Sequence, residues 1–298
     1  MKKILPQNEQ AVGNFLLDGY FCSMIDFPNA KINLGLRVIR KRTDGYHDIQ
    51  TLFFPVGLSD VLEIVPNHAQ TANIEVTGLV PEGDPQSNLC MKVWEILHKE
   101  KGIPGVDMYL HKQIPSGAGL GGGSSDAAFA LKMLDRLFDL SLTEEQLKEY
   151  AVRIGSDCPF FLYNCPMAAQ GRGEVLSRVG VDLNGYYLVL VIPPLHVPTR
   201  EAYAQITPAE PPEPVQKTVL RNIELWREHL VNDFEEPAFK KYPLLADIKN
   251  RLYQAGAVYA SMSGSGSALY GLFTDKPEVH ALSEGNRIFI EKIGSMFH

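Results

Sequence analysis

The most informative stretch of this chain reads Pro115-Ser116-Gly117-Ala118-Gly119-Leu120-Gly121-Gly122-Gly123-Ser124-Ser125-Asp126-Ala127-Ala128. Five glycines fall within the seven positions 117–123, and a helix-forming run begins at residue 124. Glycine has no Cβ, so its backbone amide can approach a ligand closely and its φ can be positive. The first turn of a helix adds unpaired amides and the positive end of the helix dipole. The stretch therefore predicts a loop that binds an anion such as phosphate.

Three other interpretations of this stretch are weaker. A Walker P-loop ends in Gly-Lys-Ser/Thr, which is missing here. Gly117, Gly119 and Gly122 match the letters of a dinucleotide fingerprint, but Pro115 precedes them and no repeated strand–helix–strand pattern surrounds them. A flexible linker would not usually separate a strand-like run (106–110) from a strongly patterned helix. A distinct glycine-rich phosphate loop is favoured.

The composition limits the classes of protein. The chain has 298 residues, of which 45% are hydrophobic, and a net charge of −7. This length accommodates two domains or one large one, and the negative charge argues against a nucleic-acid binder. No apolar run approaches the roughly 20 residues that span a bilayer. Residues 6–10 are polar and interrupt any signal-peptide core behind Met1. We expect a cytoplasmic protein that acts without a membrane or a nucleic acid.

Residues 1–23 differ from the rest of the chain because they carry only weak hydrophobic periodicity. Met24 stands directly before a strand-like segment. Our hypothesis is that residues 1–23 are an N-terminal extension, not native to the protein, and that Met24 is the native start.

The periodicity of the remaining chain predicts an α+β fold, with a strand-rich first half and a mixed second half that join between residues 165 and 195. Asn88 is a predicted helix cap, and Thr143 with Gln146 forms a predicted capping box. We expect strands over residues 27–38, 60–65, 72–77, 106–110, 168–179, 186–192, 258–262 and 268–273. We expect helices over residues 88–102, 124–138, 143–155, 220–230 and 244–253.

Three short motifs, taken together, resemble one enzyme family. They are Pro28-Asn29-Ala30-Lys31-Ile32-Asn33, then Asp44-Gly45-Tyr46-His47, and then Gly119-Leu120-Gly121-Gly122-Gly123-Ser124-Ser125. A second small-residue segment, Ser263-Gly264-Ser265-Gly266-Ser267, follows later. Their order and wording resemble the GHMP kinases, the superfamily of galactose, homoserine, mevalonate and phosphomevalonate kinases. Within it, the chain resembles the 4-diphosphocytidyl-2-C-methyl-D-erythritol kinases from about residue 27 to residue 273.

The resemblance implies a two-domain kinase with ATP and Mg²⁺ as cofactors. Residues 24–180 would form the ATP-binding N-terminal domain, and residues 181–298 the C-terminal domain. The implied nucleotide-binding residues lie in the glycine-rich loop and in the adenine pocket. They are Asn88, Leu89, Lys112, Pro115, Ser116, Gly117, Ala118, Gly119, Leu120, Gly121, Gly122, Gly123, Ser124 and Ser125.

The catalytic pair that the resemblance implies is Lys31 and Asp157. Phosphoryl transfer needs positioning, charge neutralisation and a group near the proton of the attacking hydroxyl, which an ammonium and a carboxylate can supply. Without the resemblance, Asp157 would be interpreted as a helix cap after Gly155-Ser156, and Lys31 as a solvated charge on a strand.

The implied acceptor is a small molecule, a methylerythritol linked to cytidine diphosphate. Tyr46 and His47 match the residues that recognise cytosine, and Tyr203 would stack on the other side of the base. The substrate-contact positions are Asn33, Tyr46, His47, Phe53, Thr199 and Tyr203. Asp126 stands where some relatives carry asparagine, which would change the charge near Mg²⁺. The motifs assign no metal ligand.

The function predicted is phosphorylation of the C2 hydroxyl of this acceptor by ATP in isoprenoid precursor biosynthesis. One alternative is another GHMP kinase, although its substrate would lack a base to stack on Tyr46. A second is a nucleotide-binding regulator without turnover, although Lys31 and Asp157 are both present. We expect a monomer or a homodimer.

Overall fold

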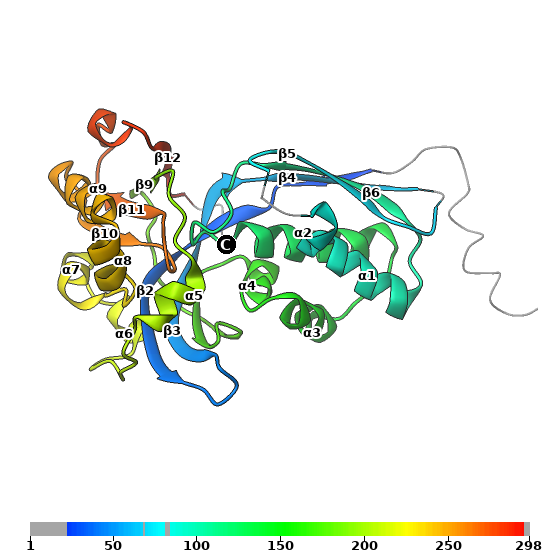
Figure 1. Ribbon diagram of the computed structural model, residues 1–298, viewed down its shortest axis with the longest axis horizontal. Helices are drawn as coiled ribbons and strands as arrows, with labels where there is room; N and C mark the ends of the chain where they lie inside the picture. Colours follow the sequence, from blue (N-terminus) through cyan, green and yellow to red (C-terminus); the bar gives the residue numbers. More distant parts are fainter. Residues whose placement is uncertain (1–22, 68, 81–83, 295–298) are drawn as a thin grey trace, which may run out of the picture.

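The computed structural model describes residues 23–67, 69–80 and 84–294. The predicted extension over residues 1–23 therefore lies outside the described residues, except for its last residue. Within the described part, the strands form three four-stranded sheets. Figure 1 shows α1–α4 against one sheet and the C-terminal elements around another, with the long β2–β3 hairpin between these two halves. None of the described helices is both long enough and apolar enough to cross a membrane.

The first sheet has the strand order β1-β4-β6-β5, and only its β5–β6 pair is parallel. Its strands are β1 (Met24–Asp26), β4 (Val61–Pro66), β6 (Val106–Lys112) and β5 (Asn73–Gly78). Four helices bury their apolar sides in a common core with this sheet. They are α1 (Leu89–Lys101), α2 (Gly122–Leu137), α3 (Glu144–Ile154) and α4 (Cys158–Tyr163).

The second sheet is antiparallel, with the order β2-β3-β7-β8. Its strands are β2 (Asn29–Lys41), β3 (His47–Ser59), β7 (Met167–Gly171) and β8 (Val175–Arg178). The register of β2 against β3 shifts between Leu34 and Leu36, beside Gly35 with φ +65°. This bulge lets β2 pack into two cores: Ile32 and Leu34 contribute to one, and Leu36 and Val38 to the other.

The third sheet is antiparallel as well, with the order β10-β11-β9-β12. Its strands are β10 (Tyr259–Met262), β11 (Leu269–Phe273), β9 (Tyr187–Ile192) and β12 (Arg287–Lys292). The helices of this part are α5 (Thr199–Ala204), α6 (Val215–Thr218), α7 (Trp226–His229), α8 (Glu235–Lys241) and α9 (Pro243–Gln254). Short 3₁₀ turns lie at Pro85–Ser87, Ile223–Leu225 and His280–Leu282. The α+β class and the mixed second half are confirmed, while the domain boundary after residue 180, between β8 and β9, stays a prediction.

Local capping signals predicted the first-half helices well. The Asn88 side chain accepts a hydrogen bond from the Cys90 amide, and Gly102 ends α1 in the left-handed conformation. Thr143 and Gln146 make both bonds of the capping box that starts α3. These signals act within one helical turn, so the sequence shows them directly.

Two predicted elements are wrong. The strand over residues 168–179 is a hairpin of β7 and β8, because Gly171 and Gly173 with φ of +67° and +114° turn the chain between them. The helix over residues 220–230 is a series of short turns and α7. Here the Asn222 side chain accepts a hydrogen bond from the Glu224 amide, which starts a new turn where the helix would have continued.

Three charged side chains meet in the interior between the first sheet and α2. Lys112 Nζ donates to Asp60 Oδ2 and, over 2.6 Å, to Asp126 Oδ2, and all three side chains are at most 3% exposed. Burial raises the pKa of Asp126 to about 8, and the nearby Lys112 ammonium only partly opposes this. The Asp126 side chain thus lies in the core, and its burial is the cause of the raised pKa. We call this group the Asp60–Lys112–Asp126 cluster.

The raised pKa of Asp126 predicts a pH-dependent stability. Between about pH 4 and pH 8 the folded chain holds a proton on Asp126 that the unfolded chain releases, so stability falls as pH rises through this window. The slope from this group reaches up to about 1.4 kcal/mol per pH unit. Asp126→Asn, which cannot titrate, should flatten the curve. Urea unfolding of both proteins at pH 5, 6, 7 and 8 tests this, and parallel curves would contradict it.

Candidate functional site

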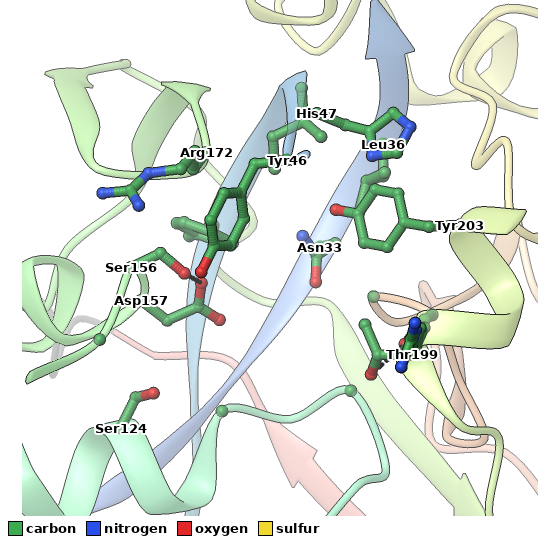
Figure 2. A pocket seen from close by; sticks show the side chains of 18 of the residues that line it. Asn33, Leu36, Tyr46, His47, Ser124, Ser156, Asp157, Arg172, Thr199 and Tyr203 are labelled. Carbon is green, nitrogen blue, oxygen red and sulfur yellow. Dashed lines mark hydrogen bonds between the residues drawn. The ribbon is translucent and has the colours of Figure 1, made fainter. Parts of the chain in front are cut away.

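A cavity of about 1130 Å³ lies against β2 and the start of β3. Segments far apart in the sequence line it: β2 and the start of β3, the glycine-rich loop, the turn between α3 and α4, the β7–β8 turn, α5, and the loop between β10 and β11. Figure 2 shows side chains from these segments pointing toward one another across the cavity. The glycine-rich loop and the two residues of the implied catalytic pair thus border the same space.

Lys31 lies on β2 and is 3% exposed, so it is not the solvated charge that the isolated residue would suggest. Its Nζ donates to Asn33 Oδ1 over 2.6 Å and to the Gly119 carbonyl over 3.1 Å. The same ammonium lies 4.9 Å from the centre of the Phe53 ring. Asn33 and Phe53, two predicted substrate-contact residues, are thereby held at the wall of the cavity.

Asp157 stands at the N-terminal cap position of α4, yet its side chain makes no capping hydrogen bond. Its Oδ2 lies 3.7 Å from Lys31 Nζ, and the side chain is 30% exposed. Burial lowers the pKa of Lys31, and the Asp157 carboxylate opposes that effect. The pair consists of a carboxylate open to the cavity and a buried ammonium beside it. This arrangement suits a carboxylate that accepts the proton of a substrate hydroxyl and an ammonium that stabilises negative charge.

The glycine-rich loop directs its carbonyls toward the protein. The Gly119 carbonyl accepts from Lys31 Nζ and from Ser263 Oγ, and the Leu120 carbonyl accepts from the Lys31 amide over 2.9 Å. The amides of Gly119 and Gly121 make no hydrogen bond with another residue in the described part of the chain. The loop then enters α2, whose first amides have no intrahelical partner. Carbonyls engaged inward and free amides are the arrangement that binds phosphate.

The second small-residue loop, between β10 and β11, packs directly against the first. A Cβ on Gly119 would lie 2.0 Å from the Ser263 carbonyl oxygen, so the two backbones are in contact. Ser265 Oγ lies 3.3 Å from the Thr199 hydroxyl at the start of α5. Gly264, Ser265 and Thr199 all line the cavity.

An aromatic group lies at the other end of the cavity. The His47 and Tyr203 rings are stacked, with centroids 4.8 Å apart and planes 19° apart. Tyr46 is 58% exposed, and the Arg172 guanidinium lies 5.1 Å from its ring centre. In Figure 2, Tyr46 stands across from the His47–Tyr203 stack with its hydroxyl toward Asp157. Burial lowers the pKa of His47, with help from Lys41, and raises the pKa of Tyr203 to about 12.

Several predicted nucleotide-binding residues do not line this cavity. Lys112 belongs to the buried cluster, so its ammonium is engaged by two carboxylates. Asn88 caps α1, and Leu89 lies about 4.0 Å from the position of a Cβ on Gly123. Of the glycine-rich loop, Gly117, Gly119, Gly121 and Ser124 line the cavity. Their neighbours Pro115, Ser116, Ala118, Leu120, Gly122, Gly123 and Ser125 are not among its lining residues.

The sequence analysis missed the positive charge of the cavity. Lys41, Arg153, Arg172 and Arg200 line it together with Lys31. Lys41, Arg153 and Arg172 belong to none of the motifs, whereas Arg200 directly follows Thr199, a predicted substrate-contact residue. For Arg172 a signal existed, because Gly171-Arg172-Gly173 is a turn-forming sequence inside an apparent strand.

Gly119→Ala should be strongly destabilising. Its φ is +79°, and the new methyl group would overlap the Ser263 carbonyl oxygen. Left-handed strain and overpacking together should cost about 2–4 kcal/mol of unfolding free energy. Gly180→Ala is the control, because Gly180 has open space around it. Thermal unfolding of both variants tests this; equal melting temperatures would show that the two loops are not in rigid contact.

Comparison with known proteins supports the resemblance that the motifs predicted. The models named GHMP kinases N terminal domain and GHMP kinases C terminal match residues 88–165 and 215–291. A 4-diphosphocytidyl-2-C-methyl-D-erythritol kinase of Bacteroides fragilis is 47% identical over 258 residues, which is 86% of this chain and 94% of the relative.

Two solved structures have a similar fold. A 4-(cytidine 5'-diphospho)-2C-methyl-D-erythritol kinase matches with a TM-score of 0.72 and 34% identity, covering 90% of this chain and 98% of its own. The mevalonate kinase of Methanococcus jannaschii shares the fold at 15% identity, with a TM-score of 0.68 and coverages of 92% and 99%. With this identity over most of both chains, the protein belongs to the 4-diphosphocytidyl-2-C-methyl-D-erythritol kinase family of the GHMP kinases.

Proposed function

We propose that this protein uses ATP to phosphorylate the C2 hydroxyl of 4-(cytidine 5'-diphospho)-2-C-methyl-D-erythritol, giving the 2-phosphate and ADP, in isoprenoid precursor biosynthesis. The observation that carries the proposal is one cavity lined by three different parts. They are the glycine-rich loop, the Lys31–Asp157 pair and the aromatic group of Tyr46, His47 and Tyr203. The names of the relatives agree with it.

In this proposal Asp157 accepts the proton of the acceptor hydroxyl, and Lys31 stabilises charge on the transferring phosphoryl group. The two atoms involved, Asp157 Oδ2 and Lys31 Nζ, are 3.7 Å apart. The transition state of phosphoryl transfer is loose, so the proton leaves late and Asp157 chiefly orients the hydroxyl. The free amides of the glycine-rich loop and the start of α2 would hold the nucleotide's phosphates, with Asn88, Leu89 and the Lys112 backbone beyond them at the adenine.

The acceptor would bind at the aromatic end of the cavity. The base would lie between Tyr46 and Tyr203. The His47 ring, which stacks on Tyr203 in this structure, would have to turn to bring its nitrogens to the edge of the base. Aromatic stacking contributes about 1–3 kcal/mol per base. Arg172 lies beside Tyr46, where a guanidinium would attract the diphosphate of the acceptor.

Mg²⁺ belongs to the same proposal. The described residues hold no group of three His, Cys, Asp or Glu side chains arranged for a metal. In kinases, however, Mg²⁺ is bound mainly by substrate phosphates and water with one or two carboxylates. Asp157 supplies a carboxylate at the wall of the cavity, so the residues present fit an ion that arrives with the nucleotide. When bound, Mg²⁺ neutralises phosphate charge.

The alternatives explain fewer of these observations. A GHMP kinase for mevalonate or homoserine would not need the aromatic group, because those acceptors have no base. A nucleotide-binding regulator would not need a buried lysine beside a cavity-facing carboxylate. Removing the Lys31 ammonium from water costs free energy, and a protein without turnover would gain nothing in return.

An ADP-release assay with a panel of acceptors tests the activity. With ATP and Mg²⁺ we expect turnover with the cytidine diphosphate-linked methylerythritol and none with mevalonate, homoserine or galactose, because only the first can occupy the aromatic end. Phosphorus NMR of the product should show a new phosphate monoester. Turnover with mevalonate or homoserine but not with the cytidine conjugate would establish the rival kinase.

Removing either member of the Lys31–Asp157 pair should abolish turnover. Asp157→Asn keeps the size of the side chain but cannot accept the proton, so kcat should fall by about 10²–10⁴-fold. Lys31→Ala should have an effect at least as large. Asp275→Asn, an equivalent change at an exposed position, is the control. Circular dichroism should show that the variants are folded, and near-normal kcat in either would refute the assigned roles.

A further inference from the structure

Both ends of the glycine-rich loop are attached to the Asp60–Lys112–Asp126 cluster. At the entry of the loop, Asp60 Oδ1 accepts hydrogen bonds from the amides of Gln113 and Ile114, directly before Pro115. At its exit, Asp126 lies in α2 and accepts from Lys112 Nζ over 2.6 Å. Asp60 also bonds to Lys112, so one network closes the loop from both sides.

The two ends of the loop are close packed above this network. A Cβ on Gly122 would lie 2.8 Å from the Ile114 side chain and 3.3 Å from Lys112 Nζ. The entry and exit of the loop therefore meet over the lysine, and any movement of its ammonium would be transmitted to the first residue of α2. The unpaired amides of the first turn of α2 begin at that residue.

The cluster also connects to the strand that carries the catalytic lysine. The Asp60 amide donates to the Pro28 carbonyl over 2.9 Å, directly before β2. Lys31, on β2, binds the middle of the loop through the Gly119 carbonyl. The entry, middle and exit of the glycine-rich loop are thus each held by a buried charged group.

We propose that Asp60, Lys112 and Asp126 are positioning residues that set the geometry of the glycine-rich loop, and thereby the affinity for the nucleotide's phosphates. None of their charged groups is among the residues lining the cavity, so they act through the backbone of the loop. A buried polar cluster with nothing to position would be an expensive structural element, because burying an ammonium with two carboxyl groups often costs more than an apolar core of equal volume. The inference rests on the proposed use of ATP.

The test compares two substitutions at one position. Asp126→Ala removes the acceptor for Lys112 and should raise KM for ATP on the order of tenfold, with KM for the acceptor within about twofold of the original. Asp126→Asn keeps an oxygen that accepts from Lys112 and should restore most of the affinity for ATP. Calorimetric titration with ADP, without acceptor, should show the same ranking of affinities: Asp126→Ala should bind ADP more weakly than the original protein and Asp126→Asn.

A matched variant distinguishes an effect on protein stability from an effect on the geometry of the glycine-rich loop. Leu252→Ala removes a fully buried side chain from α9, in the other half of the molecule, and should lower the melting temperature without changing KM for ATP. If Asp126→Ala and Leu252→Ala have equal KM values for ATP, or if Asp126→Ala raises both KM values alike, the proposal is wrong.

A second variant applies if Asp126→Ala does not fold. Asp60→Asn keeps the side-chain volume but turns an NH₂ group toward either Lys112 or the amides of Gln113 and Ile114, and should raise KM for ATP severalfold. An unchanged KM in folded Asp60→Asn overturns the proposal. If the original protein releases no ADP with the cytidine conjugate, the proposed function fails instead. If the original protein does release ADP and the variants have an unchanged KM for ATP, only the positioning role is refuted.

Discussion

The structure depends on the Lys31 ammonium being buried and yet fully engaged. A buried charge without partners costs several kcal/mol, so its hydrogens must find acceptors. The Asn33 side chain and the Gly119 carbonyl accept hydrogen bonds from this ammonium, and the Asp157 carboxylate forms an ion pair with it over 3.7 Å. These groups come from β2, the glycine-rich loop and the start of α4. One charge therefore holds three distant segments in place, and the group that stabilises the fold also stands at the proposed reaction centre.

The glycine-rich loop lies between two buried charged groups, Lys31 on the cavity side and the Asp60–Lys112–Asp126 cluster on the interior side. Its carbonyls are used by the protein, which leaves its amides for a ligand. In the proposed function, this division of donors and acceptors would make the loop selective for anions without a single cationic side chain of its own. Close contact with the Ser263 carbonyl explains why glycine is required at position 119.

The acceptor end of the cavity is built on a different principle. The proposed nucleotide end consists of backbone held by buried groups, whereas at the proposed acceptor end Tyr46 is 58% exposed and contacts Arg172 through a cation–π interaction. Exposed side chains can change without disturbing a core. This is consistent with a fold shared at 15% identity with a mevalonate kinase, since backbone geometry can persist while side chains at the acceptor end differ.

The sequence by itself determined features that depend on neighbours within one turn or one motif. Asn88 and Gly102 mark the two ends of α1, and Thr143 with Gln146 marks the start of α3. The motifs around Lys31, Tyr46 and Gly119 identify the family. Local reasoning failed where local signals compete. At Asn222 the side chain bonds its own backbone and interrupts a helix, and at Gly173 an apparent strand turns into a hairpin.

Only the tertiary structure decided which charges are buried and with whom. The Lys112 ammonium is paired with Asp60, 52 residues away, and with Asp126, 14 residues away. Arg153 and Arg172 line the cavity although no motif contains them. The reason is physical: the free energy of a charged group depends on the solvent and the partners around it, and folding supplies those from distant parts of the chain.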